Sequence, residues 1–127
     1  MRPRWAVLAV VVISALATSA RADPVDVPWQ ADATAHGEWQ IAPGKFAEWC
    51  TQLRQGEKVQ WRFDADAPLN FNVHYHEGKE VRFPAKQDTA SKSEGLLDVP
   101  SDQHYCWMWS NKSKAAVTAR ATLRKVP

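Results

Sequence analysis

Several residue types that often carry chemistry are scarce in this 127-residue chain, which contains two cysteines, two methionines and four histidines. The two cysteines are too far apart in the sequence for a C-x-x-C redox pair. No nucleophile elbow, H-E-x-x-H motif or phosphate-binding loop occurs. Carboxylates are scattered and no pair of them stands out. The sequence therefore predicts a protein that is not an enzyme.

Long apolar runs are missing beyond the N-terminus. The first 22 residues contain one such run, Trp5 to Leu16, which follows Arg2 and Arg4. It is shorter than the roughly 20 residues that span a bilayer, which disfavours the alternative of an uncleaved membrane anchor. A small-x-small sequence ends at Ala22 and completes the pattern of a signal peptide. We expect residues 1–22 to be removed, which leaves an exported periplasmic or secreted chain without a membrane span.

An excess of positive charge is also lacking. The full chain has 16 Lys and Arg against 14 Asp and Glu, but Arg2, Arg4 and Arg21 belong to the predicted signal peptide. Without them the basic count falls to 13 and the net charge becomes −1. A nucleic-acid partner therefore has no electrostatic support.

The remaining chain is rich in short alternating segments that predict strands. Apolar and polar residues alternate over 58–64 and 69–76, and a glycine turn leads to a return strand over 80–83. Further strands are expected over 38–41, 103–110 and 117–124. Residues 45–53 are expected to form a helical turn or an irregular strand, and residues 86–100 a polar loop with a weak strand near Leu96-Leu97. The pattern favours an all-β, antiparallel β-sandwich of jelly-roll type. We expect an extended segment over 23–44 and the sandwich over 45–127.

A family resemblance follows from short motifs spread over residues 45–126. Trp49-Cys50 precedes the Gln55-Gly56-Glu57 turn and a strand, Asn72 to Tyr75 runs into a glycine hairpin, and Tyr105-Cys106-Trp107 leads to Ser110-Asn111. This arrangement resembles the GOLD domain, the lumenal β-sandwich of cargo receptors in the early secretory pathway. The resemblance implies a β-sandwich that binds a partner. Those receptors continue into a coiled coil, a membrane span and a cytoplasmic tail, which we do not expect here, so we do not expect the receptor function to carry over.

Both cysteines, Cys50 and Cys106, lie in the part of the chain that is expected to be exported. An even cysteine count in such a chain favours a disulfide. The GOLD resemblance implies the same pair, as a bridge between the two sheets. The alternative is a free Cys106 that acts as a thiolate metal ligand.

Two histidines form the most suggestive pair in the sequence. His74 and His76 are two residues apart on a predicted strand, so both project from its polar face. Paired imidazoles suit Cu(II), Ni(II) or Zn(II), and His104 and the thioether of Met108 are further candidate ligands that favour copper. No histidine follows Cys106 closely, which disfavours a blue-copper centre. The other interpretation is that the two histidines are simply exposed on a sheet, beside Asn70 and Asn72.

Aromatic residues suggest a second kind of site. Trp107 and Trp109 share one face of their strand, and Tyr75 lies on the predicted strand that also carries His74 and His76. They are either core residues or a platform on which a sugar, a peptide or a cation stacks. Our prediction is an exported, non-enzymatic β-sandwich that binds a protein or a small ligand. The alternative is a copper-handling protein that uses His74, His76, His104 and Met108.

Overall fold

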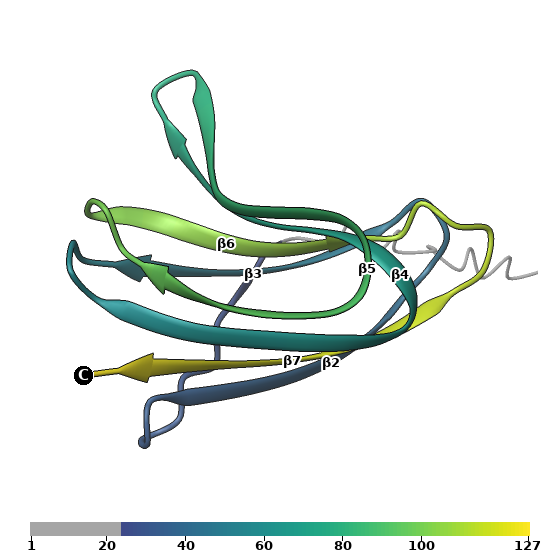
Figure 1. Ribbon diagram of the computed structural model, residues 1–127, viewed down its shortest axis with the longest axis horizontal. Coiled ribbons are helices and arrows are strands. Elements are labelled where there is room, and N and C mark those ends of the chain that lie inside the picture. The colour runs from purple at the N-terminus through teal and green to yellow at the C-terminus, as the bar shows by residue number, and fades with distance from the viewer. Residues whose placement is uncertain (1–23) are drawn as a thin grey trace, which may run out of the picture.

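The computed structural model describes residues 24–127, and the predicted signal peptide lies outside the described residues. The described part is all β (Figure 1). Its strands are β1 (Val25–Asp26), β2 (Thr34–Ile41), β3 (Phe46–Leu53), β4 (Lys58–Glu77), β5 (Glu80–Asp98), β6 (Gln103–Ser110) and β7 (Val117–Val126). Residues 24–127 contain no helix that is long and apolar enough to cross a membrane.

One continuous sheet folds over on itself to make the sandwich, because the long strand β4 belongs to both layers (Figure 1). Residues 58–65 of β4 pair with β7, which pairs with β2; we call this half the β2–β7 layer. Residues 70–74 pair with β6, which pairs with β3; this half is the β3–β6 layer. The strand β5 follows β4 through both layers as its antiparallel partner.

The bend between the layers has a local cause in β4 and β5. The pairing register shifts between Asp64 and Leu69, where Pro68 has no amide hydrogen to donate to a regular ladder. On β5, Thr89 has a φ of 57°, in the left-handed region, and its N–H donates to Asn70 Oδ1 at 3.0 Å. Two irregularities facing each other let both strands turn from one layer into the other without ending.

Aromatic side chains hold the two layers together. Trp39 of β2 stacks on Trp109 of β6 with ring centroids 4.9 Å apart, and it meets Trp49 of β3 edge-on at 4.7 Å. Phe71 lies 5.6 Å from Trp109 in the same cluster. The indoles approach the backbone of β2 so closely that a Cβ on Gly37 would lie 2.5 Å from Trp49. This packing explains why a glycine stands within a strand at this position.

Several strands extend further than the sequence predicts. Residues 86–98, expected to be a polar loop with only a weak strand near Leu96-Leu97, form the second half of β5, because the main chain of β4 pairs with them along most of their length. Residues 45–53 contain the regular strand β3 rather than a helical turn. The expected domain start at residue 45 also falls inside the sandwich, since β2 pairs with β7 over eight residues.

The predicted disulfide between Cys50 and Cys106 is present. The two residues are direct register partners on the adjacent strands β3 and β6, so the bridge lies within one layer. The expectation of a bridge between the sheets is therefore corrected. The side chains of Cys50 and Cys106 lie on the outer face of this layer. Trp49 and Trp107, the next residues along the two strands, point into the core on the opposite face.

Candidate functional site

The outer face of the β3–β6 layer gathers most of the residues that the sequence singled out. Cys50, Cys106 and His74 form one row across β3, β6 and β4, because they are register partners. The neighbouring rows place Glu48 opposite Met108, and Gln52 opposite His104. We call the surface formed by Glu48, His74, His76, His104, Met108 and the disulfide the histidine face.

His74 is held in a defined orientation on this face. It is 7% exposed, and its ring lies 5.5 Å from the ring of His76 and 6.2 Å from that of Phe83. The Nδ1–H of His74 donates to the side-chain oxygen of Asn72, with 2.7 Å between the two heavy atoms. This bond leaves the lone pair of Nε2 free, and Nε2 points to Glu48 Oε2 at 3.9 Å. A histidine with one nitrogen anchored and the other free is the usual arrangement of a metal ligand.

Burial sets the charge states at the centre of the histidine face. It lowers the pKa of His74 below the ordinary value of 6.5, and the nearby His76 lowers it further. Burial also raises the pKa of Glu48 above the ordinary 4.5, while His76 and His104 act in the opposite direction. His74 is therefore neutral near pH 7, which is the form that binds a metal ion.

Two groups of donor atoms on this face are close enough to share an ion. One group consists of Cys50, Cys106 and His104, and the other of Glu48, His74 and Cys106. Within each group the donor atoms lie within 4.8 Å of one another. Glu48 Oε1 also lies 3.4 Å from the Cys50 sulfur. Cys106 belongs to both groups, so the disulfide stands at the centre of the cluster.

The predicted aromatic platform is not formed beside the histidines. Trp107 and Trp109 are 0% and 1% exposed, and they point into the core, on the side of β6 opposite the histidine face. Tyr75 lies on that inner side too, with its ring 5.0 Å from that of Tyr105. The core interpretation of Trp107 and Trp109 holds, because both are buried and Trp39 and Phe71 from other strands pack against Trp109.

Exposed apolar residues on the histidine face were not singled out from the sequence. Phe46, Val81 and Phe83 are 40%, 40% and 47% exposed. Val81 is the register partner of His76, and Phe46 follows the same alternation along β3 as Glu48. The alternation of Val81, Arg82 and Phe83 could have indicated that Val81 and Phe83 share one face. It does not reveal that this face adjoins His74 and His76.

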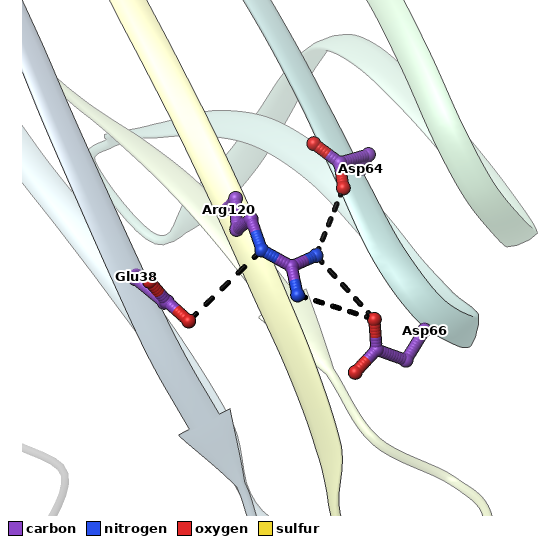
Figure 2. Close-up of polar contacts among 4 residues, drawn as sticks. All are labelled: Glu38, Asp64, Asp66 and Arg120. Atoms are coloured by element: carbon purple, nitrogen blue, oxygen red, sulfur yellow. Dashed lines mark hydrogen bonds and ion pairs between the residues drawn. The ribbon is translucent and has the colours of Figure 1, made fainter.

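The outer face of the β2–β7 layer has a different character. Arg120 of β7 lies between three carboxylates, with ion-pair distances of 2.9 Å to Asp64, 3.3 Å to Asp66 and 4.0 Å to Glu38 (Figure 2). An open groove beside it is lined by residues that include Arg62, Glu94, Leu96, Thr122 and Arg124. These ion pairs connect β7 to β2 and to β4, so we interpret the Arg120 cluster as a contact between strands rather than as a binding site.

Comparisons with known proteins support the fold. No family model matches the sequence, and no curated protein matches it. Among solved structures, PliG from Aeromonas hydrophila, a periplasmic inhibitor of g-type lysozyme, is similar with a TM-score of 0.61 and 11% identity over 81% of this chain and 96% of that one. The pre-peptidase C-terminal domain of a Bacillus anthracis collagenase has a TM-score of 0.61 and 7% identity, over 80% of this chain and 95% of that one.

PliG from Salmonella Typhimurium is also similar, with a TM-score of 0.55 and 13% identity over 81% of this chain and 98% of that one. At such identities the likeness establishes a shared β-sandwich fold, and it does not transfer a site or a partner.

Proposed function

We propose that this chain is an exported, non-catalytic domain that binds a protein through the histidine face and the adjoining β4–β5 hairpin. The observation that carries the proposal is the distribution of exposed apolar residues. Among the described residues, three of the five large exposed apolar side chains, Phe46, Val81 and Phe83, lie on this one face. Aromatic residues, surrounded by a polar rim, are typical of the centre of a protein interface.

The surroundings of Phe83 fit this role. Arg82 pairs with Glu80, and Lys86 lies 5.3 Å from the centre of the Phe83 ring. Charged residues therefore border the apolar centre, and the Lys86 ammonium lies over the Phe83 ring. The hairpin also projects beyond the rest of the β3–β6 layer (Figure 1), which makes it accessible to a partner. The structurally similar PliG proteins, described as periplasmic lysozyme inhibitors, support a β-sandwich that binds another protein.

The test is site-specific photocrosslinking in cells that export the full-length chain. A photoreactive residue at Phe83 is expected to yield a discrete crosslinked protein. The same residue at Leu96, which is 53% exposed on the other layer, is the matched control and is expected to yield none. Purified g-type lysozyme is the first partner to test directly. Identical crosslinking patterns at the two positions would contradict the proposal.

A second candidate function is copper binding by the folded, oxidised protein. Copper binding is favoured by the anchored ring of His74, which lies next to the ring of His76 and near the Glu48 carboxylate. Titration with Cu(II) is expected to show one site that is lost in His74→Ala/His76→Ala. It should persist in His36→Ala, which removes an exposed histidine from the β2–β7 layer. Retention of the Cu(II) site in the double variant would rule out this candidate.

A further inference from the structure

We propose that reduction of the Cys50–Cys106 disulfide creates a second, softer metal site on the histidine face, made of the two thiolates with His104 and His74. The expected ions are Zn(II) and Cu(I). This inference rests on the candidate function of metal binding at the histidine face and adds redox control to it. It does not depend on the proposed protein partner.

The position of the disulfide is the first argument. The bridge lies on the outer side of its layer, where the Glu48 carboxylate lies 3.4 Å from the Cys50 sulfur and neighbouring side chains leave Cys50 and Cys106 only 2% and 6% exposed. His74 is the register partner of Cys106, and His104 is two residues away on the same side of β6. A bridge that only connected β3 to β6 would not require histidines on both sides of it.

Donor spacing is the second argument. The sulfurs of Cys50 and Cys106 and a ring nitrogen of His104 lie within 4.8 Å of one another, and so do the donor atoms of Cys106, His74 and Glu48. Tetrahedral zinc binds sulfur at about 2.3 Å and nitrogen at about 2.0 Å, so its ligand atoms stand within about 4 Å of each other. The proposed ligand set joins these two groups through Cys106, and it requires side-chain rotations that bring two sulfurs and two nitrogens to these distances. Such a set suits Zn(II) and Cu(I).

The chemical step requires a reductant, and a dithiol of the thiol–disulfide exchange class supplies it. Two electrons and two protons pass from the dithiol to the protein, so Cys50 and Cys106 become thiols and the dithiol becomes a disulfide. Binding of the metal ion then displaces the two thiol protons to solvent. While the bridge is intact its sulfurs carry no thiolate, and only the histidines and Glu48 remain as strong ligands.

The strands that carry the ligands are held by more than the bridge. β3 and β6 pair over eight register positions, and β6 pairs with β4 over five more. Trp49 and Trp109 also remain packed in the core beneath the site. The reduced chain should therefore keep the histidine face assembled, which a thiolate site requires.

The experiment compares the exported protein, purified from cells that express the full-length gene, before and after reduction by a phosphine. Zn(II) and Cu(I) are titrated against chromogenic chelators. We expect one ion per reduced chain, bound about 100-fold more tightly than by the oxidised chain. Co(II) bound to the reduced chain should show thiolate-to-metal charge-transfer absorption. His104→Ala should weaken binding by the reduced chain, whereas His36→Ala should not.

Three results would overturn the proposal. Equal affinity of the oxidised and reduced chains for both ions excludes redox control. Undiminished binding by a reduced Cys50→Ser/Cys106→Ser variant excludes the thiolates as ligands. Loss of β-sheet circular dichroism on reduction, without recovery when Zn(II) or Cu(I) is added, excludes a site on the folded domain. Failure of Cu(II) binding by the oxidised chain leaves the thiolate site standing and rejects only the second candidate function.

Discussion

Removal of the disulfide is the perturbation whose effect follows most directly from the structure. Cys50→Ala/Cys106→Ala deletes the bridge and leaves the pairing of β3 with β6 to the main chain. The bridge joins residues 56 positions apart, so it restricts a large part of the unfolded chain. The chain-entropy model assigns a loop of this length about 4 kcal/mol of stabilisation.

The protein should still fold after losing the stabilisation that the disulfide provides. A domain of this size has an unfolding free energy of about 5–15 kcal/mol, so a loss of about 4 kcal/mol weakens the domain without abolishing the fold. With a urea dependence of about 2 kcal/mol per molar, the unfolding midpoint should fall by about 2 M. The melting temperature should fall by about 15–20 °C.

Urea unfolding followed by tryptophan fluorescence measures the effect, because Trp49 and Trp107 lie in the core beneath the bridge. The reduced wild-type chain is the matched comparison, since it lacks the same crosslink but keeps both cysteines. Both samples should show one cooperative transition. A loss below about 1 kcal/mol in both would refute the chain-entropy reasoning, and a non-cooperative transition would refute the claim that the strands hold the histidine face together.

Three further predictions concern single residues. Trp109→Ala, which empties the centre of the aromatic cluster, should lower the unfolding free energy in urea by about 3–5 kcal/mol. Asn111→Ala should cost about 2–3 kcal/mol in the same assay, because the buried amide donates to the carbonyl oxygens of Ile41 and Ala115, which lose their partner; an unchanged midpoint would contradict this role. For metal-free protein, the lowered pKa of His74 means that its contribution to stability is present above pH 6.5 and is lost as the pH falls through the lowered value. Unfolding at a series of pH values between 7.5 and 5 should therefore show a smaller acid-induced loss in His74→Gln than in the wild type.

The alternating segments allowed much of the fold to be predicted, because a strand in a sandwich needs apolar residues on one side only. Val59, Trp61 and Phe63 alternate with polar residues, and the structure places all three in the core. The pairing of Cys50 with Cys106 was also predicted, since the chain has only two cysteines. The same alternation placed His74 and His76 on one polar face.

The second half of β5 could not be predicted in this way. Residues 86–98 are mostly polar and exposed, and they form a strand because β4 supplies their hydrogen bonds. The buried state of Trp109 depended equally on what covers it, which is Trp39 and Phe71 from other strands. The order of apolar and polar residues within one segment contains no information about the pairing of β5 with β4 or about the side chains that pack on β6.

By itself the sequence determined the residue types, their alternation and therefore which side chains share a face of each strand. Only the tertiary structure decided which strands lie side by side. The bend in β4 and its pairing with β6 bring Cys106 beside His74, and the pairing of β6 with β3 brings in Cys50 and Glu48. Register between strands distant in the sequence is a property of the whole sheet, so the composition of the histidine face emerges only when the sheet is assembled.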